Sequence, residues 1–327
     1  MPMALAHLPT PCDPMDRLGQ QFGFPPGGLL VKRDDLTGLA GGGNKARKLE
    51  LLCADAIAAG ADTLVTGGGK QSNHVRMTAA AARVLDLQCT VVLAADPPTE
   101  PSEPTGNVVL DELFGPEIVW AGPLDYFPLE DRIVTESARL EQEGRRPYTI
   151  PIGGASTVGA LAYALAVNEM LAQVSDVDLV VVADGSGGTH AGLVAGFGDH
   201  TRVLGVDVGT RPNLDDAVRA MAAAVARELG RPEPTGSALI DHDRFGDGYG
   251  APTDACLEAL VFAARLEGIV LDPVYSGKAM AGLIAAIREG RVDPARQRVV
   301  FLHTGGMPAL FSGRYSAWIH SAVAPKA

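Results

Sequence analysis

The 327 residues of this chain are enough for two domains of ordinary size, and 46% of them are hydrophobic, so each domain can fill a core. The net charge is −12 at pH 7, whereas nucleic acids and anionic membrane surfaces attract clustered Lys and Arg. Composition and charge therefore indicate a globular protein that binds neither nucleic acid nor a membrane.

Short apolar segments typical of strands alternate with helix-like segments along the chain. The first strand is predicted at residues 63–66, followed by an Ala-rich helix at 75–85 and a second strand at 89–94. Continuous apolar runs such as residues 179–183 are typical of parallel sheets that are covered on both faces. The alternation predicts an α/β protein with parallel sheets. The remaining strands are predicted at 117–120, 148–150, 178–183, 203–208 and 299–302, and the remaining helices at 161–172, 213–229, 253–268 and 278–289.

The cysteines and the N-terminus indicate the cellular compartment. The four cysteines are widely spaced and no Cys-x-x-Cys motif occurs, so we predict neither a metal site nor a redox dithiol. This pattern favours a reducing compartment. The first ten residues lack the basic and apolar stretches of a signal peptide, and no uninterrupted apolar run reaches about 18 residues. We therefore predict a cytoplasmic protein.

Lys45 is one of only six lysines, and it follows a run of three glycines at the start of a helix-like segment. Glycines let the backbone turn sharply and approach a ligand closely. A lysine held there is a candidate Schiff-base nucleophile, provided that burial leaves its amine neutral. The alternative is a glycine-rich turn before a solvated basic helix, and this motif alone does not separate the two.

Two further glycine-rich loops follow predicted strands. Residues 184–192, DGSGGTHAG, place backbone N–H groups and a hydroxyl at a helix start, where the helix dipole favours an anion such as a phosphate. The dinucleotide pattern G-x-G-x-x-G fails, since the sixth position counted from Gly185 is His190. Residues 67–74, GGGKQSNH, end in three polar residues that either cap a helix or grip a substrate carboxylate: Ser72, Asn73 and His74.

Two tyrosines and a second double glycine complete the set of motifs. Tyr249 lies between two glycines, Tyr275 precedes Ser276, and residues 302–306, LHTGG, end a predicted strand. Isolated tyrosines are usually packing residues. The motifs nevertheless fall at the carboxyl ends of predicted strands, where open α/β sheets bind ligands. One lysine, one phosphate loop, one carboxylate grip and two phenols together predict pyridoxal phosphate and an amino-acid substrate.

With these motifs in this order, the chain resembles the D-cysteine desulfhydrase and 1-aminocyclopropane-1-carboxylate (ACC) deaminase family, in the tryptophan-synthase-β-like group of pyridoxal-phosphate enzymes. The resemblance implies fold type II, in which two open, twisted parallel-sheet α/β domains hold the cofactor in the cleft between them, and a homodimer. The large cofactor-binding domain would comprise residues 1–48 and 160–327, and the small substrate-side domain residues 49–159. The matching motifs span nearly the whole chain: GGNKxRKLE, QSNH, GSGGTHAGL, YGAP, LDPVYSGKAMAGL and FLHTGG.

The resemblance also implies roles for individual residues. Lys45 would hold the cofactor as a Schiff base, and Asn73 would contact its ring hydroxyl. The substrate carboxylate would bind at Ser72, Asn73 and His74. Tyr249 and Tyr275 match the family's two active-site tyrosines, so that they, Lys45 and Ser72 are the candidate catalytic residues. The cofactor phosphate would be held by a single loop: Gly185, Ser186, Gly187, Gly188 and Thr189.

Two positions divide this family. The deaminases carry Glu after the second tyrosine and Leu in the strand-end motif, whereas this chain has Ser276 and Thr304, as the desulfhydrases do. Both residues are candidate cofactor contacts. A neutral Ser276 hydroxyl beside the ring nitrogen would make a weaker electron sink than a carboxylate, which keeps that nitrogen protonated. The substitution favours β-elimination of a good leaving group, and the expected reaction converts D-cysteine to pyruvate, sulfide and ammonia.

Other substrates and classes remain open at this point. Lys70, Met77 and Asp184 depart from the residues usual in the family. If Lys70 points inward, it would attract a sulfonate and the enzyme could be an L-cysteate sulfo-lyase; if it points outward, it is a surface charge. ACC deaminase and a pathway-specific lyase are further alternatives. A nucleotide-dependent oxidoreductase fails on the missing third glycine, and a non-catalytic cofactor-binding protein would not need every polar site residue that is present.

Overall fold

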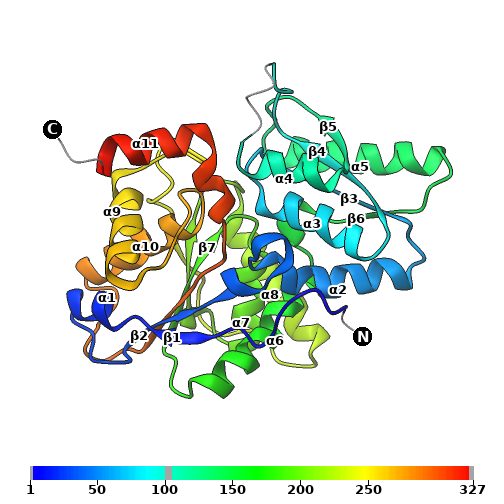
Figure 1. Ribbon diagram of the computed structural model, residues 1–327. Helices are drawn as coiled ribbons and strands as arrows, with labels where there is room; N and C mark the ends of the chain where they lie inside the picture. The colour runs from blue at the N-terminus through cyan, green and yellow to red at the C-terminus, as the bar shows by residue number, and fades with distance from the viewer. Residues whose placement is uncertain (1–2, 100–104, 324–327) are drawn as a thin grey trace.

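The computed structural model describes residues 3–99 and 105–323, which form two sheets with helices around them (Figure 1). The larger sheet has the strand order β1-β2-β10-β7-β8-β9 and the smaller one β5-β4-β3-β6. The larger sheet is built from Cys12–Pro14 (β1), Leu29–Lys32 (β2), Leu179–Asp184 (β7), Val203–Asp207 (β8), Leu239–Asp241 (β9) and Val299–Leu302 (β10). The smaller sheet is built from Thr63–Gly68 (β3), Gln88–Leu93 (β4), Glu117–Trp120 (β5) and Pro147–Thr149 (β6).

The predicted α/β fold with parallel sheets is confirmed. Both sheets are parallel throughout, except that β1 pairs antiparallel with β2. β1 is a three-residue edge strand that ends in Pro14, a residue tolerated at sheet edges because it cannot donate a ladder hydrogen bond. The sequence did not predict β1, β2 or β9.

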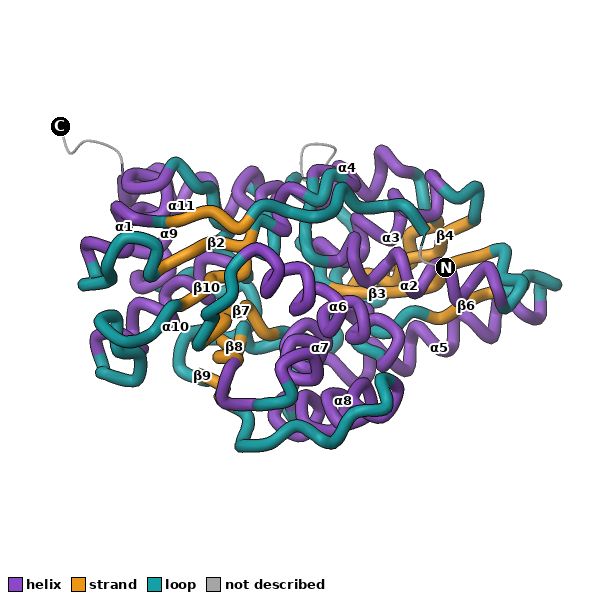
Figure 2. Tube along the Cα trace, turned by 90° about the horizontal axis from the view of Figure 1, so that it is seen from below, coloured by secondary structure: helices purple, strands orange, loops and turns teal. Residues whose placement is uncertain are grey.

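The larger sheet is covered on both faces because alternate side chains of its strands point in opposite directions. Leu179 and Val181 of β7 pack with the helices Asp16–Gln21 (α1), Asp254–Phe262 (α9) and Ser276–Arg288 (α10). Val180 and Val182 pack against the helices Thr157–Gln173 (α6), Gly188–Phe197 (α7) and Leu214–Glu228 (α8). Figure 2 shows these two groups of helices on opposite sides of the orange strands. The continuous apolar runs in the sequence arise from this two-sided burial.

The smaller sheet is likewise covered on both faces. Leu64 and Val91 pack with helices Lys45–Ala58 (α2) and Asn73–Val84 (α3), whereas Val65 and Val92 pack with Tyr126–Gln142 (α5). Helix Asn107–Phe114 (α4) lies against α3, and helix Gly313–Val323 (α11) ends the described chain. No helix among the described residues is long and apolar enough to cross a membrane. No group of three or more His, Cys, Asp or Glu in residues 3–99 and 105–323 is arranged to hold a metal ion.

Most predicted helices and strands are found within a few residues of their expected bounds. One helix differs, since the segment predicted at 253–268 is α9 followed by a π-helical turn at Ala263–Glu267. The expected domain boundaries at residues 48 and 160 both fall inside helices, α2 and α6, which pack against each other. The division of the chain at these two residues stays a prediction.

Candidate active site

A cavity opens where carboxyl ends of strands from the two sheets meet. Its lining comes from the start of α2, the start of α3, the loop after β7 and the loop after β10. A second cavity of about 180 Å³ adjoins it and shares Ser72 and Tyr275 with it. The structure therefore brings most of the predicted site residues to one place. Those that line the first cavity are Lys45, Ser72, Asn73, His74, Gly185, Ser186, Gly187, Gly188, Thr189, Tyr275 and Thr304.

Lys45 is the first residue of α2, and its side chain faces this cavity. Burial lowers the pKa of its amine to about 8, although the nearby carboxylate of Asp184 opposes that shift. A substantial fraction of the amine is therefore neutral near pH 7 to 8, as a nucleophile requires. The reading of this motif as a solvated basic helix start does not fit the structure.

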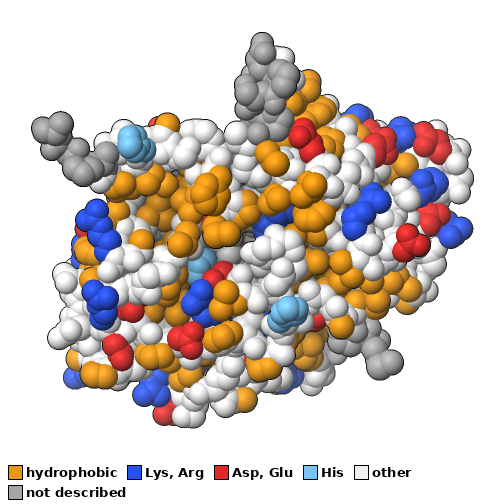
Figure 3. Space-filling model, viewed as in Figure 1, with side chains coloured by type: hydrophobic (Ala, Val, Ile, Leu, Met, Phe, Trp, Pro, Cys, Tyr) orange, Lys and Arg blue, Asp and Glu red, His pale blue; other side chains and the backbone are white. Residues whose placement is uncertain are grey.

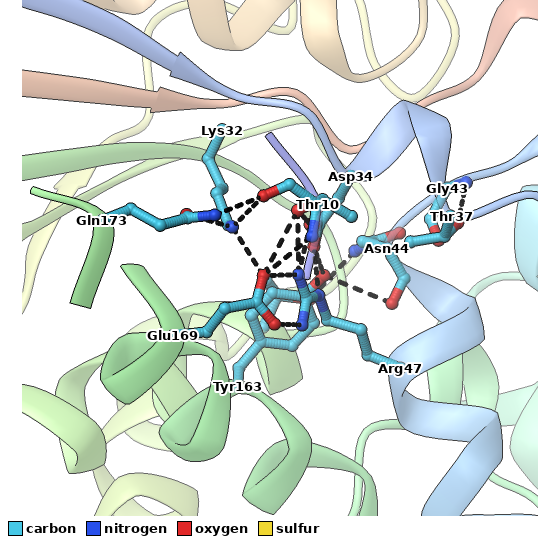
Figure 4. Close-up of polar contacts among 11 residues, drawn as sticks. Thr10, Lys32, Asp34, Thr37, Gly43, Asn44, Arg47, Tyr163, Glu169 and Gln173 are labelled. Atoms are coloured by element: carbon cyan, nitrogen blue, oxygen red, sulfur yellow. Dashed lines mark hydrogen bonds and ion pairs between the residues drawn. The ribbon is translucent and has the colours of Figure 1, made fainter. Parts of the chain in front are cut away.

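A buried polar network fixes the first turn of α2 (Figure 4). Arg47 forms ion pairs with Asp34, at 2.9 Å, and with Glu169 of α6, at 2.8 Å. Tyr163 of α6 donates one hydrogen bond to the Asp34 carboxylate, and its hydroxyl lies 3.3 Å from the backbone oxygen of Asn44. These contacts join the start of α2 to α6 and to the turn that follows β2. These contacts could not be predicted from the sequence, because most of the partners are far apart along the chain.

Two other lysines, Lys278 and Lys70, do not line the cavity. The Lys278 ammonium donates to the backbone oxygens of Phe245, at 3.0 Å, and Gly248, at 3.4 Å. This contact holds the loop that carries Tyr249. Lys70 is exposed and lines neither of the two cavities that the described residues form around the site.

The loop between β7 and α7 has the shape of an anion site. Gly188 is the first residue of α7, so the backbone N–H groups of this ten-residue helix open onto the cavity. A Cβ atom at Gly188 would lie only 2.8 Å from Nζ of Lys48, which shows how closely that amine approaches the loop. The Lys48 side chain is fully buried, and Nζ donates to the backbone oxygen of Gly153.

Lys48 was not among the residues predicted for the site. Burial holds the pKa of its amine well below the usual range, and the charge of Lys45 contributes to that shift. An anion at the start of α7 would restore the favourable environment for a charged amine. The available sequence signal was the spacing, since residues three apart on a helix share a face and Lys48 follows Lys45 by three.

Asp184 faces both the cavity and a buried histidine. Its carboxylate lies 2.6 Å from Nδ1 of His190, and both side chains are almost completely buried. His190 therefore donates to Asp184, and the carboxylate stays close enough to Lys45 to affect the pKa of that amine.

The start of α3 shows one of the two roles that the sequence left open, the capping of the helix. Ser72 caps the helix, because its hydroxyl oxygen accepts from the backbone N–H of Val75 at 3.3 Å. The Thr66 hydroxyl donates to Ile150, so Nε2 of His74 must donate to Thr66. Burial and the charges of Lys45 and Lys48 hold the pKa of His74 well below its usual range. A neutral His74 whose Nδ1 is an unpartnered acceptor cannot donate a hydrogen bond from that atom to a carboxylate.

Tyr249 and Tyr275 meet at the second cavity. Their hydroxyls are hydrogen-bonded to each other and their rings pack edge to face with centroids 5.9 Å apart. Burial raises the pKa of both phenols above the usual value. Both hydroxyls therefore stay protonated at neutral pH.

Ser276 and Thr304 occupy different places. Ser276 is fully buried, and its hydroxyl donates to Oδ1 of Asp272 at 2.6 Å while it accepts from the backbone N–H of Asp272. Thr304 lines the cavity. The sequence interpretation gave Ser276 a free hydroxyl, but in the structure its proton is directed to Asp272. Asp272 was not among the predicted site residues, although it lies in the LDPVYSGKAMAGL motif.

Comparison with known proteins agrees with this geometry. Residues 3–305 match the family of pyridoxal-phosphate dependent enzymes. The chain is 42% identical over 321 residues to the D-cysteine desulfhydrases of Salmonella choleraesuis and Salmonella newport, with 95% of this chain and 95% of each relative covered. Its structure is similar to that of an ACC deaminase homologue, with a TM-score of 0.88, 35% identity, and 98% of this chain and 96% of that one covered. Threonine deaminase isoform 2 from Solanum lycopersicum, at 15% identity, shares the fold with a TM-score of 0.65 over 96% of this chain and 83% of that one. The chain therefore belongs to the pyridoxal-phosphate-dependent enzymes of fold type II.

Proposed function

We propose that this enzyme is a D-cysteine desulfhydrase, which converts D-cysteine and water to pyruvate, sulfide and ammonia. The single observation that carries the proposal is the position of the Lys45 amine, in a cavity lined by the loop after β7 and by the start of α3. Burial lowers the pKa of this amine to about 8. The relatives named D-cysteine desulfhydrase support the choice of substrate. The preference for the D form rests on those relatives alone.

The described residues fit pyridoxal phosphate. Lys45 would attach it covalently, and the start of α7 together with Lys48 would bind the phosphate. The missing side chain at Gly188 leaves room for that phosphate beside Lys48. Asn73 would contact the ring oxygen, and Thr304, which lines the cavity, would contact the ring. When bound, the cofactor acts as an electron sink for negative charge at the substrate Cα.

The enzyme's own side chains would then bind the substrate and move its protons. The N–H groups at the start of α3 and the Ser72 hydroxyl hold the substrate carboxylate. The Lys45 amine accepts the Cα proton, because its pKa of about 8 keeps part of it neutral. Tyr275, supported by Tyr249, donates a proton to the departing sulfur. Water then completes the conversion to pyruvate and ammonia.

The rate at which cofactor is incorporated into the apoprotein should rise with pH, with a midpoint near 8. Only the neutral Lys45 amine attacks the cofactor aldehyde, and its pKa is about 8. In Asp184→Asn the carboxylate that favours the charged amine is lost, so the Lys45 pKa and the midpoint should both move lower. Stopped-flow absorbance across pH 6 to 10 measures the midpoint. A midpoint that moves higher in Asp184→Asn would contradict this assignment.

A substrate panel distinguishes the desulfhydrase from its rivals. We expect D-cysteine to be turned over at least about tenfold faster than ACC, which corresponds to about 1.4 kcal/mol in barrier height. Lys70→Ala should change activity less than about twofold, because Lys70 is exposed and surface substitutions have small effects. Pyruvate, 2-oxobutyrate and sulfite release from D-cysteine, L-cysteine, L-cysteate and ACC provide the measurement. Sulfite as the dominant product, lost in Lys70→Ala, would assign the enzyme to the sulfo-lyases instead.

We also propose that the enzyme is a cytoplasmic homodimer. All four cysteines are free thiols, as is usual for proteins of reducing compartments. Figure 3 shows hydrophobic side chains gathered on the large domain below α11, and exposed apolar patches commonly mark protein interfaces. Four large exposed side chains flank the end of β10: Leu36, Val270, Met307 and Phe311. Light scattering should give twice the 33.9 kDa chain mass, and Phe311→Asp should lower it.

A further inference from the structure

Arg76 is a cation in the second turn of α3 that has no role in the function proposed above. Its side chain is fully buried. Nη1 donates to the side-chain oxygens of Asn73, at 2.8 Å, and Asn107, at 2.6 Å, and Nη2 donates to the backbone oxygen of Gly42 at 3.0 Å. No carboxylate among the described residues forms an ion pair with it. A buried charge held only by neutral oxygens is costly unless an anion lies near.

The contact with Arg76 fixes the orientation of the Asn73 amide. A guanidinium has donors and no acceptor, so the Asn73 atom that faces it must be the carbonyl oxygen. Nδ2 of Asn107 donates to the same oxygen at 3.2 Å. Since both contacts lie on the Oδ1 side, the NH₂ group of Asn73 is left for the cavity that this residue lines. Any atom that Asn73 contacts in the cavity must therefore be an acceptor.

The positive charge behind Asn73 is not cancelled by its acidic neighbour. Burial lowers the pKa of Arg76 to about 10, so the guanidinium stays charged at neutral pH. Burial raises the pKa of Asp111, the nearest carboxyl, to about 8, and neither of its oxygens has a hydrogen-bond partner. Asp111 is consequently mostly neutral at pH 7. The buried guanidinium, which hydrogen-bonds to Asn73, therefore contributes a positive charge behind that amide, and this charge favours an ionised oxygen beside it.

Arg76 also connects the parts of the site. Gly42, whose backbone oxygen it binds, lies three residues before Lys45. Asn107 at the start of α4 is held in turn by Gln71, whose side-chain and backbone oxygens accept from it at 2.9 and 3.0 Å. The Arg76 guanidinium thus connects the loop before Lys45, the start of α3 and the start of α4. Its oxygen partner on Gly42 is a backbone atom, and the side chains of Asn73 and Asn107 are each held by a further hydrogen bond.

We propose that Arg76 is a positioning residue that directs the Asn73 NH₂ group at the ionised ring oxygen of pyridoxal phosphate and stabilises the negative charge on that oxygen. This inference rests on the proposed function, since it requires Asn73 to lie beside the cofactor ring. It goes beyond that function by assigning the orientation of the amide and the source of the charge.

The test compares pyridoxal phosphate with its 3-deoxy analogue, which keeps the aldehyde and the phosphate but has no ring oxygen. Equilibrium dialysis of the apoprotein gives the affinity for each. In Arg76→Met the affinity for pyridoxal phosphate should fall at least about tenfold, as expected for the loss of a hydrogen bond to a charged group. The affinity for the 3-deoxy analogue should fall less than about threefold. Because both affinities come from one variant, any general damage to the fold affects them equally.

Three further variants sharpen the result. Asn73→Ala should show the same discrimination, and adding Arg76→Met to it should cause little further loss, since Arg76 acts through Asn73. Arg76→Lys keeps the charge and should restore part of the affinity. Asn107→Ala removes one hydrogen bond from Arg76 and one from Asn73. The affinity for pyridoxal phosphate should therefore fall more than the affinity for the 3-deoxy analogue. This variant carries the test if Arg76→Met does not fold.

Two outcomes would overturn the inference in distinguishable ways. An equal loss of affinity for both cofactors in Arg76→Met would show that Arg76 only ties the loops together. An Asn73→Ala variant that binds the two cofactors as the wild type does would show that Asn73 does not contact the ring oxygen, so the proposed site assignment would fail first. The absorbance band of the bound cofactor provides an independent check, because it should shift in Arg76→Met and in Asn73→Ala.

Discussion

Lys45→Ala is expected to lose covalent attachment of pyridoxal phosphate and to turn over D-cysteine at less than about one thousandth of the wild-type rate. The replacement has no amine for covalent catalysis and none to accept the Cα proton, and proton transfer alone typically contributes about 10²- to 10⁴-fold. The fold should survive, since Lys45 makes no ion pair among the described residues and its neighbour Arg47 carries the contacts that anchor α2.

Borohydride reduction followed by peptide mapping tests the attachment directly. In the wild type the reduced cofactor should be found on the peptide that contains Lys45, and in Lys45→Ala it should be absent. Lys70→Ala is the matched control, because that side chain is exposed and should leave labelling unchanged. Label on Lys48 or Lys278 in the wild type would show that the wrong lysine has been assigned.

Gly188→Asp is expected to weaken cofactor binding at least about a hundredfold while the apoprotein remains folded. The new carboxylate would stand at the start of α7 and pair with Lys48, whose Nζ lies 2.8 Å from the position of the added Cβ. The carboxylate would thus repel the phosphate and form an ion pair with Lys48, which would otherwise bind the phosphate. Gly188 is a better site for this test than Gly187, whose φ of 89° makes any replacement strained.

Gly188→Ala and Lys48→Met separate the two causes of that loss. Each removes the Lys48 contact without adding a negative charge, so each should cost only about tenfold. Cofactor titration of the apoprotein measures all three variants, and thermal melting of the apoproteins checks their folds. If Gly188→Asp binds the cofactor as tightly as Gly188→Ala does, the phosphate lies elsewhere.

The long strands and helices could be predicted from the sequence because burial on both faces leaves a local pattern. β7 is a run of apolar residues, and it is apolar because its alternate side chains face different groups of helices. β1, β2 and β9 could not be predicted in the same way. Lys32 in β2 illustrates the difficulty, since its buried amine looks like a surface charge until Glu169 is brought to within 2.5 Å of it.

The site was only partly predictable from the sequence. Residues in local motifs could be predicted, whereas residues that act through contacts with distant segments could not. Lys45, the loop at 185–189 and the start of α3 each carry a local motif of glycines and polar residues. Arg76 and Asp272 carry no such signal, because their significance lies in what they contact. Ser276 was predicted to contact the cofactor, but its hydroxyl donates to Asp272. The sequence alone does not reveal this contact.

By itself, the sequence determined the α/β class, most of the longer strands and helices, the cofactor class and the lysine that would bind the cofactor. Each of these depends on residues that are close along the chain, where spacing, glycine content and apolar runs set the local structure. Only the tertiary structure decided that Lys70 faces solvent, that Lys48 approaches the phosphate loop and that Arg76 orients Asn73. Those facts depend on burial and on contacts between distant segments, and a side chain's pKa, partners and orientation are fixed only when both segments are in place.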